Sequence, residues 1–198
     1  EKSSPPKIAP MTGNMILSVL SAGPVGTGDR IGKEDKHNIF LACRADGQLV
    51  RPDAPLLPLD ESYVSLAEHK HAPVLAYTYT QHESATTGYL FAFNRQRNSE
   101  KYFRVQPEKL GLKGEVVVFD PVSEKMTDVQ AGAYCTDTLP ASGYAYYIIA
   151  PVNASGIAFF GDKGKIAATG KKRIASIIEA GDKLKIKILF APEENEIT

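Results

Sequence analysis

Short segments of β-branched and aromatic residues recur from about residue 72 to the end of the chain. Residues 74–79 and 88–93 have this composition, and the polar stretch 81–87 between them predicts an antiparallel pair. Apolar residues at helical spacing are rare in this part of the chain. We therefore predict further strands at residues 102–105, 115–119, 145–150, 156–160, 172–178 and 183–190.

The clearest strand signal lies near the C-terminus, where apolar residues alternate with lysines after the turn at residues 180–182. Such alternation places one set of side chains on a buried face and the other set in solvent. The apolar set is Leu184, Ile186 and Ile188, and the solvent-facing set is Lys183, Lys185 and Lys187. Together with the other short strands, this pattern predicts a mainly β chain that contains an antiparallel β-sandwich.

The first 60 residues have a different composition. Residues 1–10 are polar and rich in proline, which is typical of a linker or tail. The apolar run 15–20 fits a strand or a helix when judged by its length alone. Residues 36–44 have helical spacing of apolar positions, with Asp46-Gly47 as the expected stop.

Pro52, Pro55 and Pro58 follow this predicted helix. Proline fixes its own φ and disfavours helix for the residue before it. We therefore expect no regular structure as far as Asp60, and an extended segment that leads into the predicted sandwich.

A block rich in glycine lies between the apolar run and the predicted helix. It reads Gly-Pro-Val-Gly-Thr-Gly-Asp-Arg-Ile-Gly, and it is followed by His37-Asn38, Asp46-Gly47, Arg51 and Leu57-Pro58-Leu59-Asp60. In order and spacing this series resembles the end of the catalytic barrel in family 36 glycoside hydrolases, the group of α-galactosidases, raffinose synthases and seed-imbibition proteins.

The resemblance implies a division of the chain. Residues 1–10 would be a linker or tail, residues 11–65 the tail of the barrel, and residues 66–198 a C-terminal β-sandwich that packs against the barrel. It favours the end of a helix at 15–20, followed by a short strand at 24–27. The expected fold is thus an antiparallel β-sandwich preceded by a short α/β remnant of a (β/α)8 barrel.

The resemblance also bears on activity. The two catalytic aspartates of the family lie on earlier barrel strands, so they have no counterpart here, and we expect no catalytic residue in this chain. Asp29 would stand at the rim of the active site and bind substrate only together with the rest of the barrel. The chain alone is expected to be inactive, as the non-catalytic region of a parent glycoside hydrolase that acts on carbohydrates.

Other aspartates have turn-like neighbours, where their side chains bond the local backbone. They are Asp35, Asp46, Asp53, Asp60, Asp120 and Asp162. Gly26 and Gly28 suggest a phosphate-binding loop, but no Lys-Ser/Thr pair follows them and Pro24 precedes them. We therefore expect neither a nucleotide nor any other cofactor.

Charge and composition exclude some partners. The chain has 23 Lys and Arg residues and 23 Asp and Glu residues, so its net charge is zero. Binding of nucleic acid or of an acidic membrane surface requires an excess of basic residues. We expect neither partner, and an extracytoplasmic compartment is slightly favoured among those left open.

Three histidines and several tyrosines allow alternative sites. His69, His71 and His82 could suggest a metal site, but a solvated loop is the simpler interpretation, and we expect no metal. The tyrosines could stack on sugars or pack in the core. They are Tyr77, Tyr79, Tyr89, Tyr144, Tyr146 and Tyr147. Cys43 and Cys135 have no partner motif and are expected to be buried free thiols.

A second function class stays open: an independent carbohydrate-binding or surface-adhesion β-sandwich. The two classes differ in what surrounds Met15, Ile16, Leu20 and Phe40. A detached barrel tail should expose these side chains and self-associate, or bind the barrel of its own parent. A self-contained module should bury them in its own fold.

Overall fold

The structure is a computed structural model that describes residues 13–26, 28, 30–192 and 194–197. The predicted tail, residues 1–10, and Asp29 lie outside the described residues. In chain order the elements are α1 (Gly13–Leu20), α2 (Lys36–Ala42), β1 (Leu57–Pro58), α3 (Asp60–Ala67), β2 (Val74–Gln81), β3 (Thr86–Phe93), β4 (Lys101–Val105), the 3-10 helix η1 (Pro107–Leu110), β5 (Val116–Asp120), β6 (Lys125–Val129), β7 (Cys135–Leu139), β8 (Tyr144–Pro151), β9 (Ile174–Ala180) and β10 (Lys183–Ile188).

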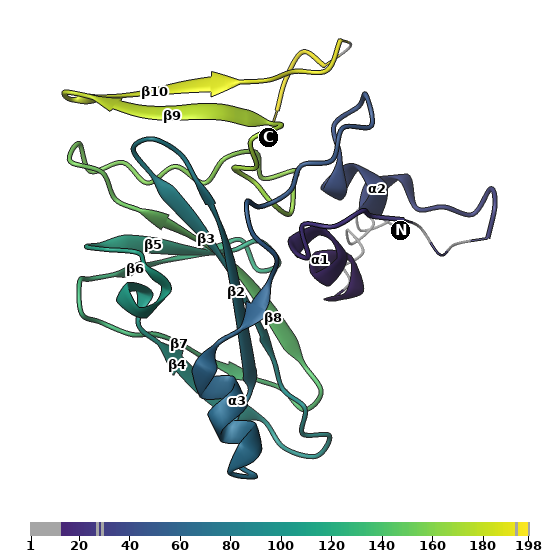
Figure 1. Ribbon diagram of the computed structural model, residues 1–198, viewed down its shortest axis with the longest axis vertical. Coiled ribbons are helices and arrows are strands. Elements are labelled where there is room, and N and C mark those ends of the chain that lie inside the picture. The colour runs from purple at the N-terminus through teal and green to yellow at the C-terminus, as the bar shows by residue number, and fades with distance from the viewer. Residues whose placement is uncertain (1–12, 27, 29, 193, 198) are drawn as a thin grey trace, which may run out of the picture.

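The chain is mainly β, as predicted. Its main sheet has the strand order β1-β2-β3-β8-β5-β6, and every neighbouring pair in it is antiparallel (Figure 1). The described residues also form two smaller antiparallel sheets, β4 with β7 and β9 with β10. The predicted pairing of β2 with β3 is confirmed, with Tyr77 opposite Leu90.

The main sheet is covered on both faces. In β3 and β8 most residues are buried, because successive side chains point to opposite faces and both faces carry a core. In β8, for example, Tyr147 and Ile149 belong to one hydrophobic cluster, whereas Tyr146 and Ile148 belong to the other. Burial on both faces explains why these strands read as continuous apolar runs and do not alternate with polar residues.

The first cluster lies between the main sheet and the small β4–β7 sheet, in the manner of a β-sandwich. Phe103 and Leu139 from the small sheet pack here against Leu90 and Val118 of the main sheet. Leu110 and other residues near η1 close one side of the cluster.

The second cluster lies on the opposite face and is covered by the N-terminal segment. Ile16 and Leu20 of α1 and Leu41 of α2 pack against Tyr89 and Tyr146. The loop residues Ile166, Ala167 and Ala168 complete the layer, and all three are fully buried. In Figure 1 the two helices stand beside the sheet, on the side away from β4 and β7.

The N-terminal helices form for local reasons. The apolar run that was open between strand and helix is helical in α1, because Ile16, Val19 and Leu20 share one buried face. Asp35 caps α2, and its Oδ1 accepts hydrogen bonds from the backbone of His37 at 2.9 Å and of Asn38 at 3.4 Å.

Two predictions for the N-terminal half need correction. Residues 24–26 do not form the predicted strand, and residue 27 lies outside the described residues. Residues 52–60, expected to lack regular structure, contain the short strand β1, and α3 begins at Asp60 and spans the predicted boundary between residues 65 and 66. The division of the chain at that boundary stays a prediction.

The strand predictions also missed or misplaced some elements. Residues 156–160 form only a bridge between Val152 and Ala158, because the Asn153 side chain accepts the backbone N–H groups of Ser155 and Ile157 and closes a turn. Strands β6 and β7 were missed because they are largely exposed and rich in polar residues.

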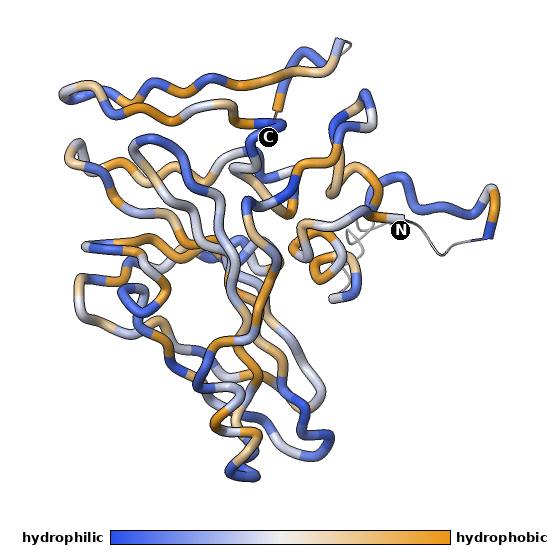
Figure 2. The backbone as a smooth tube through the Cα atoms, in the orientation of Figure 1, coloured by the Kyte–Doolittle hydropathy of each residue, from blue (hydrophilic) through white to orange (hydrophobic). Residues whose placement is uncertain are grey.

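The C-terminal hairpin has the predicted alternation, visible along β10 in Figure 2. Its apolar face is half-buried rather than fully buried, since the hairpin covers only the end of the main sheet. Ile186 pairs with Ile177, which is the more buried of the two. Ser84, in the turn between β2 and β3, donates a backbone hydrogen bond to the Ile177 carbonyl at 3.2 Å.

We expect the largest stability effect in the hairpin at Ile177. Replacing this buried side chain with alanine should cost about 2–5 kcal/mol, because transfer and cavity terms add. Lys185→Ala, on the solvent face, should cost no more than about 0.5 kcal/mol. Ile186→Ala should fall between them. Chemical denaturation of the three variants measures the order, and equal losses at Ile177 and Lys185 would contradict the register.

A matched pair on α1 tests whether the N-terminal segment is part of the core. Leu20 is fully buried, whereas Leu17 on the same helix is 41% exposed. Leu20→Ala should therefore cost about 2–5 kcal/mol. Leu17→Ala should cost much less. Thermal unfolding followed by circular dichroism compares the two, and an unchanged midpoint for Leu20→Ala would show that the sheet folds independently of α1.

Candidate functional site

The residues that resemble the barrel end are held together by local contacts. Arg51 donates hydrogen bonds to the carbonyls of Ala22, at 2.9 Å, and Gly23, at 3.4 Å. It thereby joins the segment before β1 to the start of the glycine-rich block. His37-Asn38 lies in the first turn of α2, and Gly47 has a φ of 79° in the turn after that helix. The structure does not describe Asp29, so its predicted role stays untested.

Most of the predicted turn aspartates bond to their neighbours. Asp35 caps α2, and Asp120 accepts the backbone N–H of Val122 at 2.8 Å. Asp53 differs, because its Oδ2 accepts hydrogen bonds from the Gln81 backbone at 3.0 Å and from Lys171 Nζ at 2.7 Å. Asp162 accepts the backbone N–H of Gly164 at 2.9 Å, as predicted, and it is also buried in an ion pair with Arg173 that the sequence did not indicate.

The histidines lie in separate places. His82 is buried, and its Nε2 lies 2.8 Å from the carbonyl oxygen of Thr169. His71 Nδ1 lies 3.1 Å from the side-chain nitrogen of Gln96. Within the described part of the chain, no group of three His, Cys, Asp or Glu residues could hold a metal ion.

Residues 13–60 pack against the main sheet and the loop 160–173. Backbone hydrogen bonds run from Ile166 to the Leu41 carbonyl at 3.0 Å and from Asp53 to the Tyr79 carbonyl at 2.9 Å. The approach is close at Gly170, where a Cβ would lie 2.8 Å from the Arg51 carbonyl oxygen. We refer to this contact between residues 13–60 and the sheet with its loop 160–173 as the N-terminal interface.

The hydroxyls of two buried tyrosines hydrogen-bond to the loop 160–173 at this interface. The Tyr146 hydroxyl donates to the Ile166 carbonyl at 2.5 Å. The Tyr89 hydroxyl lies 2.9 Å from Thr169 Oγ1 and accepts the Thr169 backbone N–H at 3.1 Å. Both tyrosines thus pack in the core, and burial raises the pKa of each. Their hydroxyls satisfy the backbone of a loop that is itself buried.

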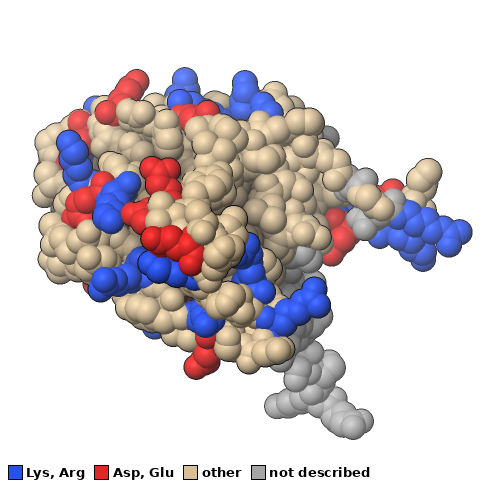
Figure 3. Space-filling view, turned by 60° about the horizontal axis from the view of Figure 1, so that its bottom comes forward, with Lys and Arg blue, Asp and Glu red and all other residues tan. Residues whose placement is uncertain are grey.

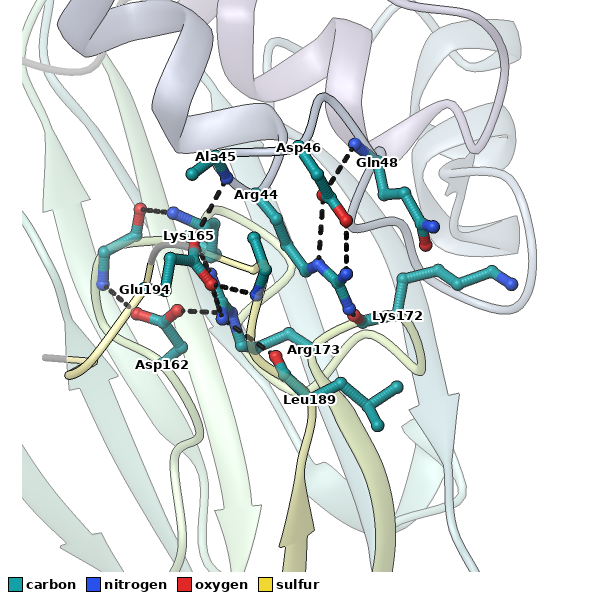
Figure 4. A network of polar contacts seen from close by, with 12 residues as sticks. Arg44, Ala45, Asp46, Gln48, Asp162, Lys165, Lys172, Arg173, Leu189 and Glu194 are labelled. Atoms are coloured by element: carbon teal, nitrogen blue, oxygen red, sulfur yellow. Dashed lines mark hydrogen bonds and ion pairs between the residues drawn. The ribbon is translucent and has the colours of Figure 1, made fainter.

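A network of charges closes the end of the interface (Figure 4). Arg173 is buried, and its guanidinium contacts Glu194 at 2.6 and 2.8 Å, while its Nε lies 2.8 Å from Asp162 Oδ2. Glu194 also accepts the backbone N–H of Ala45 at 3.0 Å, just after α2. The network therefore joins the N-terminal segment, the loop before β9 and the C-terminal segment.

A second arginine strengthens the same junction. Arg44 forms two hydrogen bonds with the carboxylate of Asp46, at 3.2 and 2.5 Å, and one with the Lys172 carbonyl at 2.9 Å. The hydrogen bonds from Arg173 hold the pKa of Glu194 well below its usual range. Glu194 therefore stays ionised through ordinary acidic conditions.

An open apolar groove lies at the edge of the interface. It has a volume of about 660 Å³ and runs between α1 and the adjacent part of the main sheet. Its lining includes Leu17, Leu56, Phe91, Phe93 and Tyr144. Leu17 and Phe93 are among the exposed large apolar residues of the chain.

Other apolar residues of the N-terminal segment are exposed. Ile31 is 94% exposed and Phe40 is 46% exposed, whereas Ile16 and Leu20 are fully buried within the chain. The burial test therefore does not decide between the two function classes. One part of the N-terminal segment is buried in the core of this chain, and another part is exposed to solvent. The segment that leads into α2 projects from the body, at the right of Figure 1.

The surface has no single sign of charge over the face drawn in Figure 3, where basic and acidic side chains are interspersed. None of the described helices is long and apolar enough to cross a membrane. Cys43 and Cys135 are buried free thiols, as predicted, and burial raises the pKa of Cys135 to about 11.

Comparisons with known proteins give a limited result. No protein-family model and no curated protein matches the chain. A solved structure from Bacillus halodurans, of a protein provisionally named an alpha-N-acetylgalactosaminidase, matches with a TM-score of 0.36 and 12% identity. The match covers 41% of this chain and 19% of that chain. The likeness to a glycoside hydrolase is thus partial, it assigns neither fold nor activity, and family 36 stays a resemblance in sequence.

The charge network leads to a prediction about pH. Glu194→Gln should cost about 3 kcal/mol near pH 7, because it leaves Arg173 buried with one carboxylate fewer. The folded-state pKa of Glu194 is lowered, so its contribution is complete above the unfolded value of about 4.3 and declines as the pH falls below it. The difference in unfolding free energy between wild type and variant should therefore shrink below about pH 4.

Glu196→Gln is the matched control, since Glu196 is exposed in the same segment. Urea titrations of the three proteins at several pH values measure the effect. A difference for Glu194→Gln that stays constant from pH 7 to pH 3 would contradict the ionic origin of its contribution.

Proposed function

We propose that this chain is the non-catalytic C-terminal region of a glycoside hydrolase, and that it supports a catalytic barrel outside the sequence. The proposal starts from the sequence resemblance of residues 23–60 to the end of a family 36 barrel. It adds a role for the N-terminal interface, which fixes the barrel end to the sandwich.

The observation that carries the proposal is the uneven burial of the N-terminal segment. One side of α1 is packed on the sheet, while Leu17 on another side lines the open apolar groove. Ile31 and Phe40 are also exposed, although both belong to the segment that resembles a barrel. A barrel that preceded this segment in the chain would cover the groove and these side chains. Burial of this apolar surface would stabilise the assembly.

A buried polar atom supports the same view. Asn38 Oδ1 is buried and has no hydrogen-bond partner in the described part of the chain. It belongs to the His-Asn pair of the resembling series. Buried polar groups are normally hydrogen-bonded, so a donor from a preceding barrel strand would satisfy this atom.

One observation favours the alternative, an independent carbohydrate-binding or surface-adhesion module. Ile16 and Leu20 are fully buried in the chain's own core, as a self-contained module requires. The alternative leaves the exposure of Ile31 and the groove without an explanation, so we prefer the supporting role.

The first test is enzymatic. We expect no turnover of an activated aryl α-galactoside above the buffer rate, because glycoside hydrolysis needs two suitably placed carboxyl groups. Release of the aryl group is measured by absorbance. Turnover well above the buffer rate that a single Asp→Asn change in this chain abolishes would contradict the proposal.

The second test is genetic and separates the two functions. Sequencing the gene upstream of the Glu1 codon should reveal an in-frame barrel with two aspartates at strand ends. A start codon and no barrel in that frame would favour the independent module.

A further inference from the structure

A small cavity opens between the two layers of the β-sandwich, lined mainly by residues of β6 and β7 and of the loop before β7. Its volume is about 290 Å³. Val118 and Tyr147 of the main sheet line it, together with Thr127, Cys135 and Asp137 from the strands at its edge. The N-terminal interface lies on the opposite face of the main sheet, so this cavity is separate from the site described above.

One wall of the cavity is an exposed aromatic ring. Tyr134, in the loop before β7, is 44% exposed, and the guanidinium carbon of Arg104 lies 4.9 Å from its ring centroid. Arg104 lines a neighbouring cavity beside α3 and does not line this one. The arginine therefore holds the ring from the neighbouring side, and the side toward the small cavity is not covered by it.

The cavity lining also carries an oriented carboxylate, that of Asp137 in β7. The Tyr147 hydroxyl donates a hydrogen bond to Asp137 Oδ2, and the Thr138 backbone N–H donates to Oδ1 at 2.7 Å. Burial and the neighbouring Asp137 raise the pKa of Tyr147, so this phenol keeps its proton and remains a donor. A carboxylate has about four acceptor positions, so Asp137 can accept further hydrogen bonds.

The remaining polar groups make the cavity acidic. Asp120 and Asp128 also line it, against one basic residue, Lys125. A lining of this kind disfavours anionic ligands such as phosphates and uronic acids. It is compatible with a neutral ligand that has several hydroxyl donors and one apolar face.

We propose that this cavity binds one neutral pyranose ring. The C–H face of the sugar would stack on Tyr134, and its hydroxyls would donate to Asp137 and to the neighbouring acids. The cavity is slightly smaller than the range of about 300–1,000 Å³ that is typical of ligand pockets, which suits one ring rather than a long chain. The proposal goes beyond the supporting role and does not depend on the presence of a barrel.

The test is an NMR titration of the full chain with D-galactose, D-glucose and D-galacturonate. We expect saturable backbone amide shifts at Tyr134, Asp137 and Thr127 with at least one neutral sugar. Tyr134→Ala should abolish these shifts. Asp137→Asn should weaken binding about tenfold or more, because hydrogen bonds to a charged acceptor are the stronger ones.

The matched control is Tyr102→Ala. Tyr102 is a 59% exposed aromatic on β4, outside the lining of the cavity, so its removal should leave the shifts unchanged. Spectra of the free variants establish that each is folded. If Tyr134→Ala fails to fold, Asp137→Asn decides the outcome.

Three results would overturn the proposal: no saturable shift with either neutral sugar, shifts that survive both Tyr134→Ala and Asp137→Asn, or binding of galacturonate as tight as that of galactose. None of these results bears on the supporting role, which the enzymatic and genetic tests address. Failure of one proposal is therefore distinguishable from failure of the other.

Discussion

The burial of the main sheet on both faces is the constraint on which the rest of the structure depends. Strands β3 and β8 carry apolar side chains on both sides, so each side needs its own cover. The β4–β7 sheet covers one side, as in a sandwich, and the N-terminal helices cover the other. Removing the helices would expose Tyr89, Phe91 and Tyr146 to water. The N-terminal segment is therefore part of the core, whatever its evolutionary origin.

Loops and short helices cover the second face, and residues 166–169 are buried there without belonging to a helix or strand. Their backbone N–H and C=O groups therefore lack the partners that regular structure would supply. Their backbone groups require partners. The hydroxyls of Tyr89 and Tyr146 provide two of them, and the Leu41 carbonyl accepts from Ile166. The network around Arg173 then ties the ends of the loop to residues 45 and 194. The interface thus combines apolar burial with paired backbone and charged groups, which favours one arrangement of its segments.

The sequence predicted the fold class and most strands because their residues carry strong local signals, such as the lysine alternation of β10. It failed at β6 and β7, whose polar, exposed residues resemble loops, and at 156–160, where the turn chemistry of Asn153 overrides apolar content. The continuous apolar runs in β3 and β8 contained a further signal, since a strand that is apolar on both sides needs two covers. That signal would have identified the N-terminal segment as core. The ion pairs of Arg173 depend on residues distant in sequence, so no local pattern could indicate them.

The two proposed surfaces lie on opposite sides of the same strand. Tyr144 of β8 lines the apolar groove, whereas Tyr147 lies beneath the acidic cavity. Side chains at odd separation along a strand point to opposite faces, and the groove residues Val74 and Phe91 share the face of Tyr144. A barrel seated on the groove would therefore leave the cavity open on the far side of the sheet. A sugar bound there could not reach the barrel's active site, so the cavity would act on substrate only by holding it near the enzyme, through an increase in local concentration.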